Sequence, residues 1–254
     1  MLTVNLQIFI LWAKRHNIEF DYSPYDAKSF EELESMELAP ETIYDSNTEP
    51  IIFPKFQGEF SSLKHLKLAW FALDTIPAWV EGCKALEELN ICGNNISLIP
   101  SWLENLSHLI KLDCSSNDLY TLPSSSLLLE LDCSYNYLDG FGSWEGTLPR
   151  LQKLDCSRCK IQVLPQSIET LNALEEFIFD ETHLLDETSQ KIKARLDLKL
   201  QERKNLKNMD KKAWIEAFRV NTNKSYKKYL KAFPHGAYVD DAHVKLLERC
   251  KLKR

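Results

Sequence analysis

Six copies of one short pattern occupy the middle of this 254-residue chain. Each copy has apolar residues at its first, fourth and sixth positions, and the copies begin at Leu63, Leu86, Leu109, Leu128, Leu151 and Leu174. The intervals between them are 23, 23, 19, 23 and 23 residues. A recurring period of this length predicts a solenoid, because a unit that cannot bury its own apolar face must stack on its neighbours.

Each copy predicts a short strand followed by a turn. In the third copy, Leu112 and Cys114 alternate with polar residues, and a period of two indicates a strand with one buried face. Several copies then end their strand region with an Ile-Pro or Leu-Pro pair: Ile76-Pro77, Ile99-Pro100, Leu122-Pro123 and Leu164-Pro165. The fourth copy lacks this pair at the equivalent place, so we expect a bulged loop around residues 140–146.

The ninth position of the pattern is predicted to stabilise the turn. It carries Asn94, Asn117 and Asn136, whose amides can bond to backbone groups that the turn leaves unpaired. Cys159 takes the place in the fifth copy, and Thr182 takes it in the sixth.

The frame L-x-x-L-x-L-x-x-N/C-x-L resembles the leucine-rich repeat. The strings LDCSSNDLYTLP and LDCSYNYL resemble repeats common in bacterial proteins, and FILWAKRHNI followed by LKHLKLAWFALDTIP is similar to the front of cytoplasmic bacterial leucine-rich repeat proteins. The resemblance implies an α/β fold, a horseshoe arc of short parallel strands. It also implies a binding module without a specified ligand, because function must be argued from the displayed surface.

We expect three regions. Residues 1–62 form an N-terminal helical cap and lead-in, residues 63–185 form the repeats, and residues 186–254 form a basic helical region. The start has no positive charge before its apolar stretch and no small-residue cleavage site after it, so we expect no signal peptide. We interpret it as an amphipathic helix that covers the end of the solenoid, with a membrane-surface helix as the alternative. Its apolar face would hold Leu2, Leu6, Phe9, Ile10 and Ala13.

The lead-in from Tyr22 to Phe60 is acidic and contains four prolines, so we expect an ordered but irregular segment. Within it, SFEELESMEL predicts a short helix, opened by Ser29 with Glu32 three residues later in a capping-box spacing. No apolar run in the chain reaches the length of a membrane span.

The C-terminal region predicts helices. A charged helix comes first, with Ile192, Leu196 and Leu200 as its apolar seam. Three short helices follow, centred on Trp214, on Tyr229 and on Ala242. The string W…A…NT…Y..YL..FP.G.Y…A…L resembles a short tetratricopeptide-like helical motif, and this resemblance implies protein contact.

The cysteines favour a reducing compartment and hence a cytoplasmic location. Cys114, Cys133 and Cys156 share one inward strand position, and a total of seven argues against a disulfide framework. Cys156 and Cys159 form a C-x-x-C spacing that also occurs in redox and metal sites. The repeat frame explains both residues, one as core and one as the turn residue, so we expect no metal and no cofactor.

Charge is divided unevenly along the chain. Residues 190–254 hold 19 Lys and Arg against 7 Asp and Glu, whereas residues 1–189 hold 12 against 30. The basic tail can be a solvated surface, can meet an acidic partner, or can fold back on the acidic repeats. Nucleic acid is disfavoured as a partner, because the tail has no known nucleic-acid motif and the acidic repeats would repel phosphate.

The third, fifth and seventh positions of each copy should point away from the core, onto the concave face of the sheet. The fifth position carries Asp113, Asp132 and Asp155 on adjacent strands about 5 Å apart. This column is either a habit of the repeat type or an acidic groove for a Lys- or Arg-bearing segment, with Lys111 and Lys153 offsetting part of its charge. The candidate partner-binding residues are Trp70, Glu88, Asn90, Lys111, Asp113, Glu130, Asp132, Tyr135, Tyr137, Lys153, Asp155 and Arg158.

Catalytic motifs are missing from the sequence. It has no Gly-rich phosphate loop, no G-x-S-x-G and no H-E-x-x-H, so we predict no enzyme and no catalytic residues. Two functions remain open. The first is a module that binds a protein with a basic segment, as an adaptor or as a neutraliser of a basic protein. The second is a structural or regulatory subunit that docks through the basic helices.

Overall fold

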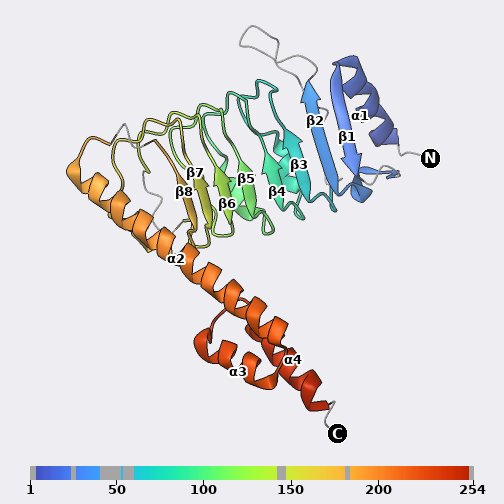
Figure 1. Ribbon diagram of the computed structural model, residues 1–254. Helices are drawn as coiled ribbons and strands as arrows, with labels where there is room; N and C mark the ends of the chain where they lie inside the picture. The colour runs from blue at the N-terminus through green and yellow to red at the C-terminus, as the bar shows by residue number, and fades with distance from the viewer. Residues whose placement is uncertain are drawn as a thin grey trace. The chain divides into compact units, whose positions relative to one another are not determined.

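The computed structural model describes residues 4–23, 27–40, 53, 60–141, 147–180 and 184–251. These fall into two compact units, residues 1–193 and residues 194–254. In the first unit the strands form one sheet with the order β1 to β8 (Figure 1). They are β1 (Ile18–Ser23), β2 (Ser35–Pro40), β3 (His65–Leu68), β4 (Glu88–Asn90), β5 (Lys111–Asp113), β6 (Glu130–Asp132), β7 (Lys153–Asp155) and β8 (Glu176–Ile178).

The repeats supply β3 to β8, which pair in parallel and in register. The fourth residue of each copy lies beside the fourth residue of the next, as Leu89 lies beside Leu112 and Leu112 beside Leu131. The leucines at the first and fourth positions are fully buried, and so are Cys114, Cys133 and Cys156 at the sixth. The predicted solenoid with a continuous core is confirmed, because equivalent apolar residues of neighbouring copies stack on one another.

In three of the 23-residue repeats, a proline marks the start of a short helix. Pro77, Pro100 and Pro165 directly precede the 3₁₀ helices η2 (Ala78–Gly82), η3 (Ser101–Asn105) and η4 (Gln166–Thr170). Proline suits this place because its fixed φ fits the helix entrance and its missing N–H has no bond to make there. The 19-residue third repeat has Pro123 but no helix after it, which accounts for its shorter length. The bulged loop expected around residues 140–146 lies largely outside the described residues.

The N-terminal helix α1 (Val4–Arg15) forms as predicted. Leu6, Phe9 and Ala13 are buried, and the ring of Phe9 packs edge-on against Phe20 of β1 at 4.9 Å between centroids. Since β1 is the first strand of the sheet, α1 covers that end of it (Figure 1). Leu2 lies outside the described residues.

The lead-in is more regular than the sequence indicated. β1 and β2 form an antiparallel hairpin, and β2 then pairs in parallel with β3, so the sheet begins before the first repeat. The string SFEELESMEL forms the 3₁₀ helix η1 (Phe30–Glu32) and then strand β2. The predicted capping box is wrong, because the Ser29 side chain makes no capping bond and the Lys28 N–H donates to Glu32 at 2.6 Å instead.

The expected series of short C-terminal helices is also wrong in one respect. The charged helix and the helix holding Trp214 are a single helix, α2 (Glu187–Val220), with no break between them. It is followed by α3 (Asn223–Ala232) and α4 (Val239–Lys251). Ile192, Leu196 and Leu200 are buried, as their spacing on one face of α2 predicts. In the described residues no helix is both long and apolar enough to cross a membrane.

The second unit has an aromatic core of its own. Tyr226, Tyr229, Ala217 and Ala242 are buried, and the indole of Trp214 stacks on Tyr238 at 5.5 Å. The aromatic residues that the sequence singled out in this region therefore pack between the helices.

Candidate functional site

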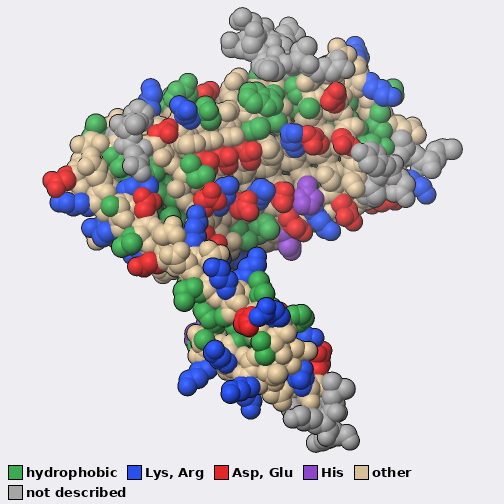
Figure 2. Space-filling view, in the orientation of Figure 1, with side chains coloured by type: hydrophobic (Ala, Val, Ile, Leu, Met, Phe, Trp, Pro, Cys, Tyr) green, Lys and Arg blue, Asp and Glu red, His purple; other side chains and the backbone are tan. Residues whose placement is uncertain are grey.

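The exposed face of the repeat sheet brings most of the predicted site residues together. We call this surface the ladder face and define it by the third and fifth positions of the repeats on β3 to β8. Figure 2 shows an acidic row across these strands and, beside it, a second row in which the sign of the charge alternates.

The alternating row is the third position of each repeat. The strand register sets these residues side by side, in the order His65, Glu88, Lys111, Glu130, Lys153 and Glu176. Lys111 pairs with Glu130 at 3.5 Å between Nζ and Oε2, and Lys153 pairs with Glu176 at 3.7 Å. The ammonium groups expected to offset the aspartates are thus engaged in ion pairs within their own row. This row neutralises itself, because opposite charges directly across a strand pair attract.

The acidic row is the fifth position, where Asp113, Asp132 and Asp155 lie on adjacent strands. The seventh-position serines hold these carboxylates. The Ser134 hydroxyl and N–H donate to Oδ1 of Asp132 at 2.7 and 3.0 Å, and Ser115 does the same for Asp113. The N–H of Ser157 donates to Oδ1 of Asp155 at 2.9 Å. A short local loop of bonds therefore fixes each carboxylate at the end of its strand.

The second carboxylate oxygens differ along this row. Oδ2 of Asp113 accepts a hydrogen bond from the Asn90 side chain at 2.9 Å. Among the residues that the structure describes, Oδ2 of Asp132 and Oδ2 of Asp155 accept no hydrogen bond from the protein. Burial, and secondarily the neighbouring charges of Asp113 and Asp155, raise the pKa of Asp132, whereas the bonds from Ser134 act the other way. Asp132 and Asp155 therefore each present one carboxylate oxygen that can accept a hydrogen bond from a partner.

A groove of about 380 Å³ continues the ladder face toward the N-terminus, over β2 to β5. Its polar lining includes Glu37, His65, Lys67 and Asp113. Lys67 forms an ion pair with Glu37 of β2, and Nδ1 of His65 lies 3.5 Å from Oε2 of Glu88. Sequence reasoning missed Glu37, because β2 was not recognised as a strand. The alternation of sign at the third position was visible in the aligned repeats and would have revealed the self-neutralising row.

The eighth position of the repeats forms the rim of the ladder face. Trp70, Ser116, Tyr135 and Arg158 have φ between 53° and 66°, and Gly93 has φ 67° at the same position. The side chains of Trp70, Tyr135 and Arg158 are exposed. A left-handed backbone costs a non-glycine residue about 1–2 kcal/mol, so this turn puts large side chains at the rim at the expense of stability. Tyr137, two residues after Tyr135, stacks on Tyr120 at 5.7 Å.

Two seventh-position residues are not on the exposed face as predicted. Ala69 is 1 % exposed and Ser134 is 8 % exposed. Both residues lie beyond the ends of their strands, since β3 ends at Leu68 and β6 ends at Asp132, and strict alternation does not extend past a strand. The predicted display therefore holds for the third and fifth positions and fails for Ala69 and Ser134.

Five of the cysteines lie in the core, namely Cys83, Cys114, Cys133, Cys156 and Cys159, whereas Cys92 is half-buried. Burial raises the pKa of Cys114, Cys133 and Cys156 well above the ordinary thiol value. Cys159 is buried at the turn position and donates from its thiol to the Cys133 carbonyl at 3.4 Å, as the repeat frame predicts for a turn residue. Within the described residues no group of three or more His, Cys, Asp or Glu side chains could hold a metal ion.

A comparison with protein families supports the fold. The leucine-rich repeat family matches residues 85–106 and 150–171. Among solved structures, a leucine-rich repeat protein of Leptospira interrogans is similar, with 22 % identity and a TM-score of 0.48 over 55 % of this chain and 42 % of that one. An internalin of Listeria monocytogenes is similar with 22 % identity and a TM-score of 0.43 over 51 % of this chain and 38 % of that one.

This chain therefore matches less than half the length of either of those two proteins. A search of curated proteins finds no significant match. Leucine-rich repeats generally serve as protein-binding modules and are typically not enzymes. The family match and the register of β3 to β8 together establish that this chain contains a leucine-rich repeat solenoid.

Proposed function

We propose that the protein is a non-catalytic interaction module whose ladder face binds a Lys- or Arg-bearing segment of another protein. The observation that carries this proposal is the row of Asp113, Asp132 and Asp155. Hydroxyl or backbone N–H groups of the neighbouring serines donate hydrogen bonds to these carboxylates. Its open oxygens can accept hydrogen bonds from an ammonium or guanidinium group, and charge-assisted bonds of this kind are the stronger ones.

The two rows of the ladder face contribute differently to binding. The third-position row has already paired its charges, so it contributes little net field. In the part of the chain that the structure describes, the aspartates of the fifth-position row have no such paired cations, so this row selects a partner segment of positive charge. The rim adds Trp70, Tyr135 and Arg158, residue types that often dominate binding energy when a partner covers them. An aromatic rim next to carboxylates suits a cation, because the face of an aromatic ring also attracts positive charge.

The proposal includes an adaptor role in the cytoplasm, in which the ladder face recruits or neutralises a basic protein. The six cysteines that the structure describes are unpaired. Free thiols are typical of proteins in a reducing compartment. Immunodetection after cell fractionation tests the location, and recovery of the protein outside the cytoplasm would contradict it.

The binding test is affinity capture from native lysate with two altered baits. One carries Asp113→Lys, Asp132→Lys and Asp155→Lys, and the matched control carries Asp74→Lys, Glu81→Lys and Glu31→Lys at exposed acidic positions off the ladder face. Both change the net charge equally. Circular dichroism confirms that each bait is folded.

A defined probe accompanies the capture, namely a fluorescent peptide with several lysines and arginines. We expect the ladder-face variant to bind it at least tenfold more weakly, and the control variant to bind it nearly as well as the unaltered chain. We also expect binding to weaken as salt is raised, because exposed charges are screened. Equal binding by the two variants would remove the ladder face as the site.

A second candidate function is docking to a larger assembly through the basic C-terminal helices. The charge of residues 190–254 favours it, with 19 basic against 7 acidic residues. Capture that survives the ladder-face variant but is lost on reversing exposed lysines of α3 supports this second function.

A further inference from the structure

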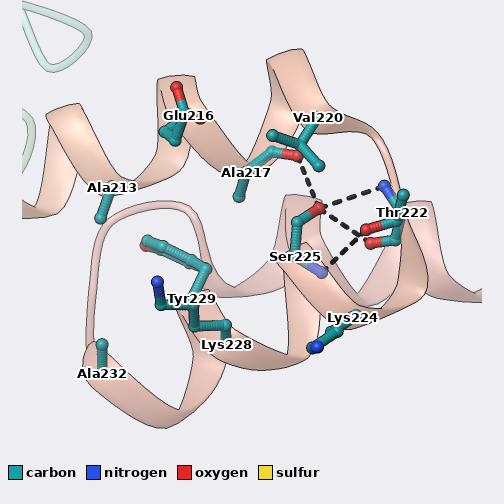
Figure 3. Close-up of a pocket in the computed structure, with 10 residues that line it drawn as sticks. All are labelled: Ala213, Glu216, Ala217, Val220, Thr222, Lys224, Ser225, Lys228, Tyr229 and Ala232. Carbon is teal, nitrogen blue, oxygen red and sulfur yellow. Dashed lines mark hydrogen bonds between the residues drawn. The ribbon is translucent and has the colours of Figure 1, made fainter.

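A groove in the C-terminal unit provides a second surface that the ladder face does not involve. It lies between α2 and α3 and encloses about 330 Å³ (Figure 3). Its apolar lining is built from Ala213, Ala217, Val220 and Ala232. Three of these are alanines, and their small side chains leave open a space that larger residues would fill. Val220 is 47 % exposed, so the groove presents apolar surface to solvent.

The groove has fixed walls. Thr222 and Ser225 form a capping box at the start of α3, in which each side chain accepts from the other residue's backbone N–H at 3.1 Å. The Ser225 hydroxyl also reaches α2 and donates to the Ala217 carbonyl at 2.9 Å (Figure 3). Tyr229 anchors the other end of the α2–α3 contact through its bond to Asp210 at 2.6 Å. These bonds hold the two helices at a constant separation, so the groove is formed before any ligand arrives.

The charge at the groove is positive. Lys224 and Lys228 line it from α3, one helical turn apart, and both are exposed. Glu216 lines it from α2, but its carboxylate is paired with Arg219 at 3.2 Å. The groove also opens beside the N-terminal end of α3, where the helix dipole favours negative charge. Residues 194–254 as a whole hold 17 Lys and Arg against 7 Asp and Glu.

We propose that this groove binds an acidic peptide segment that carries one apolar side chain. The apolar side chain enters the space over Ala213 and Ala217, and neighbouring carboxylates pair with Lys224 and Lys228. The apolar floor supplies burial, and the lysine rim selects the sign of the ligand. This site is independent of the ladder face, which selects the opposite charge.

The test uses the full chain and a fluorescein-labelled ten-residue peptide with one central leucine flanked by aspartates and glutamates. A second peptide replaces the leucine with alanine. Fluorescence anisotropy measures affinity, and amide chemical shifts of the full chain locate the contact. The test variant is Lys224→Glu with Lys228→Glu. The matched control is Lys199→Glu with Lys204→Glu, which reverses two exposed lysines on α2 away from the groove. A third variant, Ala232→Trp, fills the groove without changing charge.

We expect the test variant and the groove-filling variant each to weaken binding at least tenfold. The control pair should stay within about twofold, and the alanine peptide should bind several-fold more weakly than the leucine peptide. Equal loss in the test and control pairs, or equal binding of the two peptides, would show general attraction to a basic surface and overturn the proposal. The ladder-face variant with Asp113→Lys, Asp132→Lys and Asp155→Lys should leave this binding unchanged, so the two sites can fail separately.

Discussion

The turn asparagines show how much one side chain does in a repeat. Oδ1 of Asn117 accepts from the Ile96 N–H at 3.0 Å, and its Nδ2 donates to the carbonyls of Ile91 and Cys114 at 3.0 and 3.1 Å. The amide therefore joins the second repeat to the third. Asn94 and Asn136 bond across their own repeat boundaries in the same way. The predicted role of this position is confirmed.

Replacing Asn117 with alanine should leave the buried backbone groups that bond to its amide without a hydrogen-bond partner. We expect the free energy of unfolding to fall by about 2–4 kcal/mol, since each unsatisfied buried group costs about 1–3 kcal/mol. Urea titration followed by circular dichroism measures the change. Asn95→Ala is the matched control, because Asn95 is exposed, and we expect it to cost under about 0.5 kcal/mol. Similar losses from both variants would contradict this role for Asn117.

The negative charge of Asp132 is predicted to lower the stability of the folded chain. Because burial raises its pKa in the folded chain above the ordinary 3.8, the folded state binds more protons than the unfolded state between those two pKa values. Its contribution to stability is thus most favourable below the ordinary pKa, falls as the pH rises through this window, and stays unfavourable above it.

Asp132→Asn should therefore be more stable than the unaltered chain at pH 7, with the difference disappearing near pH 3. An asparagine Oδ1 can still accept the bonds from Ser134, so only the charge is removed. Urea midpoints at several pH values test this, and a variant that is less stable at pH 7 would contradict it. The same variant should weaken binding of the basic peptide.

At the scale of elements, the C-terminal unit depends on one buried carboxylate. Asp210 of α2 is 5 % exposed. It accepts from the Tyr229 hydroxyl of α3 at 2.6 Å and from the Ala237 N–H, just before α4, at 2.7 Å. A Cβ at Gly236 would lie 2.5 Å from the Asp210 carboxylate, so glycine is needed where the chain passes it. One side chain of α2 thus holds both following helices.

Asp210→Ala should loosen α3 and α4 while leaving the repeat sheet intact. Removing a buried carboxylate that accepts two hydrogen bonds leaves the Tyr229 hydroxyl and the Ala237 N–H without a partner. We expect this to lower the free energy of unfolding of the unit by about 2–4 kcal/mol. Hydrogen exchange should show faster exchange of amides in α3 and α4, with unchanged protection in β3 to β8. Gly236→Ala should give a similar, weaker pattern. Loss of protection in the sheet as well would mean that the two units do not unfold separately.

At the scale of the whole molecule, the two proposed sites select opposite charges from different units. The ladder face belongs to residues 1–193, and the groove belongs to residues 194–254. A chain built in this way can join a basic protein to an acidic one, which is what an adaptor does. On these two proposals, the uneven charge along the sequence is a division between two binding surfaces.

The full chain should bind a basic peptide and an acidic peptide at the same time. In anisotropy titrations, saturation with unlabelled peptide of one sign should change the affinity for the labelled peptide of the other sign by less than about threefold. The two peptides must first be shown not to bind each other at the concentrations used. Mutual exclusion would contradict separate sites, and it would favour a tail that covers the acidic repeats.

The sequence by itself determined the repeats, because leucines at fixed intervals leave each unit with an apolar face that only another unit can cover. It also determined the turn asparagines, the buried thiols of Cys114, Cys133 and Cys156, and the display of the third and fifth positions. Each of these follows from a local period or from one residue's chemistry. The repeat period also placed Asp113, Asp132 and Asp155 on adjacent strands of one face, so these candidate residues could be chosen from the sequence alone.

Only the tertiary structure decided what depends on contacts between distant segments. The hairpin of β1 and β2 has no repeat signature, and it becomes part of the sheet by pairing with β3. The continuity of α2 could not be deduced from a mixed pattern of charges. The groove between α2 and α3 exists because Ser225 and Tyr229 fix two helices at a distance that alanines do not fill. Periodicity encodes which face of an element is buried, whereas the partner that buries it is set by packing.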